Sequence, residues 1–345
     1  MDHADLQNPI FTDEDAAWAH YEQLRWPQGP ICVKCGSVDG ATRIEAKATK
    51  RTRTLKDGTK KTVEWKRRGV LKCKACGEQY TATTGTIFES SHIPMHKWLM
   101  GVHLICASKK GMSALQFQRM LGFKSYRTAW FMLHRIREAL AERGALPPLG
   151  GEGTGGIVEA DETYHGKVEN PSEYTTKGHK FRRSKHGKGP SNKRAIVALV
   201  ERGGKMRVFH VATANQATVE KIVRENVDRS ARLHTDESRL YPRVGKEFAA
   251  HETTRHSAGE YVRYEDGRVI HSNSAEGFFG LFKKGFAGCY QNCGERYLSR
   301  YLSEYEFRFN HRIKLGYDDK ARATVALQRA AGRRLTLRPL KATVS

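Results

Sequence analysis

Two short motifs of the same form constrain this chain most, Cys32-Val-Lys-Cys35-Gly36 and Cys73-Lys-Ala-Cys76-Gly77. Two cysteines separated by two residues can direct both sulfurs at one ion from a single tight turn, and the glycine relieves the crowded backbone that follows. Two such pairs complete a tetrahedral Zn²⁺ site. Because closed four-cysteine sites are structural, we expect the zinc to hold a small ribbon together. A redox dithiol would explain only one of the pairs.

The net charge of the chain indicates which class of molecule it binds. The 345 residues include 60 Lys and Arg against 37 Asp and Glu, a net charge of +23 that suits a polyanion, above all nucleic acid. A hydrophobic fraction of 39% is too high for a disordered basic tail, so the charge belongs to a folded body. Without a signal peptide or a membrane-length apolar run, we expect a cytoplasmic, nucleoid-associated protein with no membrane partner.

Pro and Gly accumulate at 146–156, where periodicity is lost, and this stretch is the expected linker. After it, strand-like runs and one helix predict an α/β fold with a mixed sheet. The expected domains are an N-terminal helix with a zinc ribbon at 12–90, a helical region at 91–145, a catalytic domain at 157–313 and a basic tail at 314–345.

The helical region has the outline of a helix-turn-helix, with a helix at about 113–121, a break at Gly122 and a second helix from about Ser125. We expect the second helix to offer Arg127, Arg135 and Arg137 to DNA. A plain helical hairpin with a solvated basic face remains the alternative. The basic insertion at 166–193, which includes Lys185, is expected to grip phosphate.

Acidic residues close two of the predicted strands. Asp161 ends GIVEAD and Asp236 ends ARLHTD. Functional groups collect at strand ends in open α/β sheets, so these aspartates are expected side by side on neighbouring strands. Carboxylates that converge in this way can hold the two divalent ions that phosphodiester cleavage uses. Turn-forming or helix-capping aspartates are the alternative interpretation.

A third acid, Glu276, lies at the start of a predicted helix, and Lys283 follows two turns later on nearly the same face. The spacing Asn273-x-x-Glu276 also fits a capping box, in which Glu276 would only cap its helix. His234 is expected to be structural. Other acids that could serve as metal ligands are Glu159, Glu162 and Glu237.

The two cysteine pairs, followed in order by VEADETYHG, LHTDESRLY and HSNSAEGFFGLFKKG, resemble the ISXO-two-like insertion-sequence transposases, a DDE-type family related to the Merlin group. The resemblance extends from about residue 15 to about residue 330. It implies a zinc ribbon and helix-turn-helix that bind transposon ends, followed by an RNase H-like catalytic domain whose acids hold Mg²⁺ or Mn²⁺.

By this resemblance Asp161, Asp236 and Glu276 are the catalytic, metal-binding acids, and Lys283 is their basic companion. Asn273 is the alternative third residue, because some family members have Asn there. The resemblance implies a transposase that binds terminal inverted repeats, cleaves and joins double-stranded DNA, and works as a homodimer or larger assembly. The alternatives are an RNase H-like nuclease without strand transfer, and a zinc-ribbon DNA-binding regulator derived from an inactive transposase.

Overall fold

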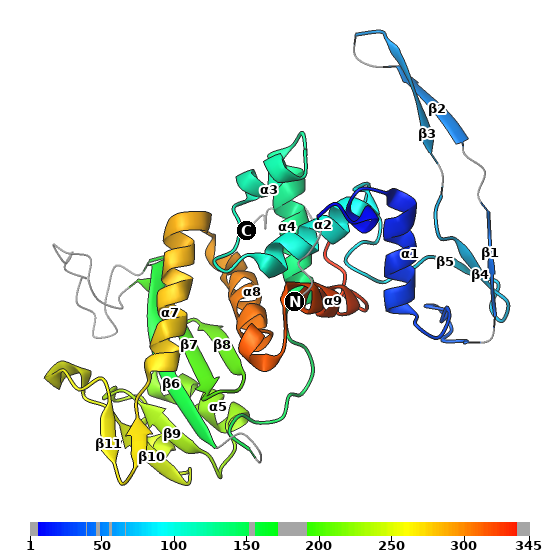
Figure 1. Ribbon diagram of the computed structural model, residues 1–345. Helices are drawn as coiled ribbons and strands as arrows, with labels where there is room; N and C mark the ends of the chain where they lie inside the picture. Colours follow the sequence, from blue (N-terminus) through cyan, green and yellow to red (C-terminus); the bar gives the residue numbers. More distant parts are fainter. Residues whose placement is uncertain are drawn as a thin grey trace, which may run out of the picture. The chain divides into compact units, whose positions relative to one another are not determined.

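The computed structural model describes residues 6–38, 40–45, 49–54, 57–65, 67–151, 156–171 and 192–336. The chain forms two compact units (Figure 1). Unit 1 comprises Met1–Ala107, Ala114–Ala139 and Asp319–Ser345, and unit 2 comprises Ser108–Ser113 and Leu140–Asp318. Among the described residues, no helix has both the length and the apolar character that crossing a bilayer requires.

The cysteine motifs of unit 1 lie on a small antiparallel sheet of order β1-β4-β5, formed by β1 (Ala41–Arg43), β4 (Leu71–Cys73) and β5 (Gln79–Tyr80). The basic stretch between the two cysteine pairs contains a separate hairpin, in which β2 (Thr49–Thr54) pairs with β3 (Lys60–Trp65). This hairpin was not anticipated from the sequence.

The helices of unit 1 are α1 (Glu14–Arg25), α2 (Met95–Ala107), α3 (Ala114–Met120), α4 (Tyr126–Leu140) and α9 (Asp319–Gln328), with a 3₁₀ turn at Pro9–Phe11. Asp13 caps α1, since its Oδ1 accepts a hydrogen bond from the N–H of Ala16 at 2.7 Å. The core includes edge-to-face contacts of Phe88 with Tyr21 and Trp98. Helix α9 packs against α2, although its residues lie in the stretch expected to be a basic tail.

Unit 2 is built on the mixed sheet that the sequence predicted. Its order is β10-β9-β6-β7-β8, in which β10, β9 and β6 pair in parallel, β7 is antiparallel to β6, and β8 is antiparallel to β7. The strands are β6 (Ile157–Lys167), β7 (Lys193–Glu201), β8 (Met206–Val211), β9 (Arg232–Thr235) and β10 (Ala250–Thr253). The edge strand β10 was not anticipated.

Helices cover both faces of this sheet (Figure 1). Helix α5 (Gln216–Asn226) packs on one face, and α7 (Asn273–Gly285) and α8 (Leu298–Asn310) pack on the other. Side chains alternate along β6, so Val158 and Ala160 enter the core under α5 whereas Glu159 and Asp161 face the α7 side. The shorter elements are α6 (Pro242–Gly245), β11 (Arg263–Glu265), β12 (Arg268–Ile270), a π-helical turn at Phe286–Tyr290, and 3₁₀ turns at His256–Ala258, Glu295–Tyr297 and Ile313–Leu315.

Candidate active site and metal centres

Two aspartates meet where β6 and β9 run side by side. The parallel register pairs Ala160 with Thr235, so the next residues, Asp161 and Asp236, are neighbours across the two strands. Asp236 directly follows β9, as predicted. The expectation that Asp161 ends its strand is wrong, because β6 continues to Lys167 through its antiparallel pairing with β7.

Glu162 joins the aspartates. One carboxylate oxygen each from Asp161, Glu162 and Asp236 lies within 4.8 Å of the others. The loop after β9 orients the group, since Tyr241 Oη and Ser238 Oγ donate to the two oxygens of Glu162 at 2.7 and 3.0 Å. The N–H of Ser238 also donates to Asp236 Oδ1 at 3.0 Å. Sequence reasoning missed Ser238 and Tyr241, although both lie in the LHTDESRLY motif.

Asp161, Glu162 and Asp236 are called the acidic group below. Ionising all three carboxyl groups together is electrostatically unfavourable. Burial raises the pKa of Asp161 to about 8, and the charges of Asp236 and Glu162 act in the same direction. Burial also raises the pKa of Glu162. A divalent cation would relieve this repulsion. Converging carboxylate oxygens are the donors that Mg²⁺ and Mn²⁺ prefer, so the residues present fit such an ion.

Glu276 is not part of the acidic group, but its charge affects the ionisation of that group. Its negative charge contributes to the raised pKa of Asp161. Its Oε1 lies 3.1 Å from Nδ1 of His256, a partner that sequence reasoning did not find. Lys283 is exposed on α7, and its charge, after burial and Arg194, helps to lower the pKa of His165 on β6.

Asn273 lies elsewhere on α7. It is exposed and, with Gly277 and Leu281, lines a cavity of about 480 Å³ that also borders Arg202 and Arg312. The carboxylates of Asp161 and Asp236 do not border this cavity. Glu276 and Asn273 therefore lie in different surroundings, although they are less than one helical turn apart.

The capping-box interpretation of Glu276 is wrong. Asn273 is already helical, and the N-cap residue Ser272 makes no side-chain cap hydrogen bond with any described residue. The first turn of α7 is bound instead by Glu159 of β6, whose Oε2 accepts from the N–H groups of Ser274 and Ala275 at 2.7 and 3.3 Å.

Two other polar residues named from the sequence have structural partners. His234 is 2% exposed, with Nε2 at 2.9 Å from Glu252 Oε2, in agreement with the structural role expected. Glu237 accepts hydrogen bonds from the N–H and Oγ of Ser257 at 2.9 and 2.7 Å. Its carboxylate thus stabilises the turn at His256–Ala258.

The four cysteines of unit 1 form the second candidate metal centre. Their sulfurs all lie within 4.8 Å of one another, and Cys32–Cys76 and Cys35–Cys73 are each 3.7 Å apart. A tetrahedral site with Zn–S bonds of about 2.3 Å requires sulfurs about 3.8 Å apart. Gly36 and Gly77 adopt φ of 76° and 73°, the left-handed conformation in which glycine is unstrained. The arrangement fits a structural zinc.

The arginines of α4 divide into two groups. Arg127, in the first turn, is exposed. Arg135 and Arg137 are only 6% and 1% exposed, so the expectation that they remain available to DNA is wrong. Arg135 donates to the carbonyl of Glu89 at 2.7 Å and packs over the ring of Trp98. Lys185 lies outside the described residues.

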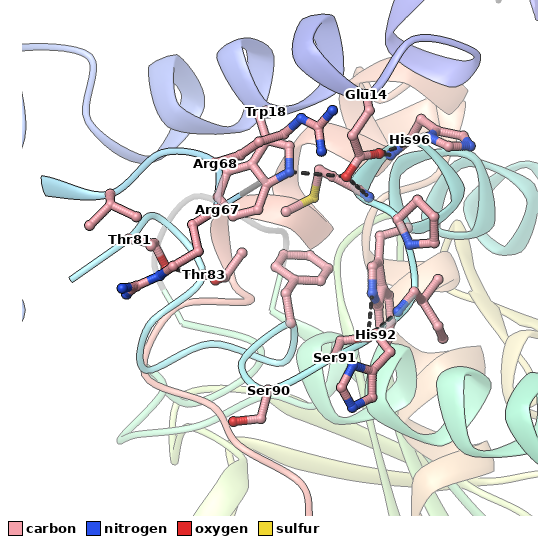
Figure 2. A pocket seen from close by; sticks show the side chains of 16 residues that line it. Glu14, Trp18, Arg67, Arg68, Thr81, Thr83, Ser90, Ser91, His92 and His96 are labelled. Atoms are coloured by element: carbon pink, nitrogen blue, oxygen red, sulfur yellow. Dashed lines mark hydrogen bonds and ion pairs between the residues drawn. The ribbon is translucent and has the colours of Figure 1, made fainter. Parts of the chain in front are cut away.

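A cavity of about 820 Å³ lies within unit 1 (Figure 2). Arg67, Arg68, Ser90 and His92 are among the residues that line it. At one side Glu14 binds the start of α2, because its oxygens accept from the N–H groups of Met95 and His96 at 2.9 and 3.2 Å. That helix end is therefore capped by the protein itself, and the arginines are the cationic groups of the cavity.

The sequence matches two family descriptions, the transposase zinc-ribbon domain over residues 12–79 and the ISXO2-like transposase domain over residues 153–310. It is also 23% identical over 303 residues to an uncharacterized protein in transposable element ISH50 of Halobacterium salinarum, a match that covers 86% of this chain and 91% of the relative. The first match spans both cysteine pairs up to Gln79, and the second spans the acidic group and Glu276. The family comparison therefore assigns residues 12–79 to the transposase zinc-ribbon domain and residues 153–310 to the ISXO2-like transposase domain.

Proposed function

We propose that this protein is a DNA transposase that binds the terminal inverted repeats of an insertion sequence and catalyses metal-dependent cleavage and strand transfer. The observation that carries the proposal is the parallel pairing of β6 with β9, which makes Asp161 and Asp236 neighbours. The mixed order β10-β9-β6-β7-β8, with helices on both faces, supports an RNase H-like fold for unit 2.

In the proposed reaction, Asp161 and Asp236, with Glu162 beside them, would hold Mg²⁺ or Mn²⁺. Such ions activate the attacking oxygen and stabilise the departing 3′-oxygen. Glu276 would complete the set from α7, and His256 would hold its carboxylate until DNA arrives. Lys283, two turns further along the helix, would contact a DNA phosphate. We favour Glu276 over Asn273 as the third residue, because Asn273 lines the cavity beside Arg202 and Arg312, which the carboxylates of Asp161 and Asp236 do not border.

Unit 1 would recognise the transposon ends. Helices α3 and α4 would act as a helix-turn-helix, a motif in which the N-terminal residues of the second helix contact base edges. In α4 those residues are Tyr126, 52% exposed, and the exposed Arg127. The structural zinc would hold the ribbon that lies before these helices in the chain. Lys185 remains a predicted phosphate contact.

The proposed partner is double-stranded DNA, both as transposon end and as target. Joining an element to its target involves both ends, so we propose a homodimer or larger assembly on DNA. A chromosomal substrate is consistent with a cytoplasmic, nucleoid-associated location, which is part of the same proposal.

The test uses purified protein, Mg²⁺ and labelled DNA that carries the inverted repeats flanking the gene. Wild type is compared with Asp236→Asn, and Glu225→Gln, an exposed acid of α5, is the matched control. We expect wild type and the control to nick the repeat boundary and join it to a second DNA, whereas Asp236→Asn only binds.

The alternatives give different products. Cleavage without joining would favour an RNase H-like nuclease. Binding of the repeats without cleavage under Mg²⁺ or Mn²⁺ would favour a DNA-binding regulator derived from an inactive transposase.

A further inference from the structure

Glu159 is a fully buried acid to which the proposed chemistry gives no part. It lies on β6 and is 0% exposed. Its Oε2 accepts from the N–H of Ser274 at 2.7 Å and from that of Ala275 at 3.3 Å, and its Oε1 accepts from Ser274 Oγ at 3.0 Å. Both oxygens are thus engaged with the first turn of α7.

These contacts replace a helix cap. The first N–H groups of a helix have no partners within it, and they attract negative charge because the helix dipole is positive at this end. A side chain next to the helix in sequence normally binds them. In α7 the carboxylate comes from a strand more than 100 residues earlier, so the cap also joins the helix to the sheet.

Arg202 compensates the buried charge. Its Nε and one terminal nitrogen each lie 3.1 Å from Glu159 Oε1. The same guanidinium donates to the carbonyls of Val269 and His271 at 2.7 and 3.1 Å, and so also fixes the chain that leads into α7. A buried carboxylate with this many donors is satisfied, but loss of its charge would leave Arg202 without its carboxylate partner.

The contacts of Glu159 also determine where Glu276 lies relative to Asp161. Glu159 precedes Asp161 by two residues on the same face of β6, and Ser274 precedes Glu276 by two residues in α7. The first turn of α7 cannot slide along β6 or unwind without breaking the bonds to Glu159. Any such movement would displace Glu276 relative to Asp161.

We propose that Glu159 is a positioning residue, which clamps the first turn of α7 to β6 and thereby fixes Glu276 beside the acidic group. The proposal rests on the proposed function for its consequence, whereas the clamp itself can be tested without any reaction.

The first experiment is amide hydrogen exchange on the full-length, zinc-loaded protein without divalent cations at the acidic group. The variant is Glu159→Gln, which keeps the size of the side chain but replaces one acceptor oxygen with an amide donor. The control is Glu220→Gln, which changes another buried acid paired with an arginine, Arg224, on the opposite face of the sheet. We expect faster exchange over Ser274–Glu276 in Glu159→Gln only.

The second experiment measures cleavage, affinity for the repeats and the Mg²⁺ concentration that gives half-maximal cleavage. For Glu159→Gln we expect about 100-fold slower cleavage and a Mg²⁺ midpoint about tenfold higher, with unchanged DNA affinity. A merely structural role would lower the rate only in proportion to the folded fraction measured by circular dichroism, and would leave the Mg²⁺ midpoint in place.

The outcomes separate the two proposals. Unchanged exchange over Ser274–Glu276 overturns the clamp. Faster exchange with an unchanged rate and Mg²⁺ midpoint overturns the positioning role. A wild type that never cuts overturns the proposed function and, with it, the positioning role, whereas the exchange result still decides whether Glu159 holds the helix.

Discussion

The hydroxyl of Tyr241 donates a 2.7 Å hydrogen bond to Oε2 of Glu162, and this bond joins the loop after β9 to the acidic group. Tyr241 is fully buried. Burial and the neighbouring carboxylates hold the pKa of its hydroxyl well above the ordinary value, so it stays a donor at every physiological pH. It can therefore orient Glu162 whether or not a metal is bound.

Tyr241→Phe should remove this bond and leave the packing of the ring intact. We expect the free energy of unfolding to fall by about 1 kcal/mol. The Mg²⁺ midpoint for cleavage should rise, because Glu162 loses a donor that orients it. Urea unfolding and a Mg²⁺ titration check the two effects. The control is Tyr264→Phe, whose ring is 79% exposed. An unchanged Mg²⁺ midpoint would remove Tyr241 from the metal-binding arrangement.

Asp161→Asn should make the metal-free protein more stable at neutral pH. The pKa of Asp161 rises from an ordinary 3.8 to about 8 on folding, chiefly through burial. When folding raises a carboxyl pKa, the free energy of unfolding is unaffected at pH values below the pKa of the unfolded state. It falls progressively as the pH rises from there toward the pKa of the folded state. The variant cannot ionise here, so its advantage should be absent near pH 4 and grow up to about pH 8.

Thermal unfolding of the zinc-loaded proteins at several pH values, in buffer free of Mg²⁺ and Mn²⁺, measures this advantage of Asp161→Asn. Mg²⁺ should then raise the melting temperature of the wild type but not that of the variant, because only the wild type gains by neutralising the acidic group. A zinc-loaded variant less stable than wild type at pH 7 without Mg²⁺ or Mn²⁺ would show that the carboxylate is held by favourable contacts.

Zinc removal should affect the two units differently. Cys73→Ser leaves three thiolates for the ion, so we expect zinc loss and unfolding of the β1-β4-β5 sheet. Unit 2 has its own cores and should keep its hydrogen-exchange protection. Cys289→Ser, at a half-buried cysteine outside the cluster, is the control and should retain zinc. Zinc content by mass spectrometry, read together with exchange, checks both expectations.

The core of the fold could be predicted because its signals are local. Strand-like runs identified the mixed sheet, and a predicted helix that starts near Glu276 corresponds to α7. Strand β10 was missed because its sequence, AHET, is short, polar and half-buried at the sheet edge. The continuation of β6 beyond Asp161 was also missed. There the strand has passed the end of β9, so its residues are less buried and need not be apolar.

The site was predicted in part for the same reason. Asp161 and Asp236 could be paired because each closes a strand-like run, GIVEAD and ARLHTD. The roles of Tyr241, Glu159 and His256 depend on contacts between residues distant in sequence, which no local pattern encodes. The burial of Arg135 could not be predicted from the sequence either. The aliphatic part of an arginine can be covered by neighbours that only the folded chain brings together.

Arg127 is exposed on α4 whereas Arg135 is buried, and this difference leads to a further prediction. Arg127→Ala should weaken binding to the repeats and reduce the slope of log affinity against log salt by about one, because one exposed cation is removed. Its melting temperature should stay unchanged. Arg135→Ala should instead destabilise the protein by about 2 kcal/mol, since it removes the bond to the carbonyl of Glu89 and the packing on Trp98. Salt-dependent fluorescence anisotropy and thermal unfolding of both variants measure these effects.

If Arg135→Ala kept its stability but lost a unit of salt slope, Arg135 would be a DNA contact and its burial would not persist on DNA. If Arg127→Ala bound the repeats like wild type at every salt concentration, the first turn of α4 would not face the DNA backbone.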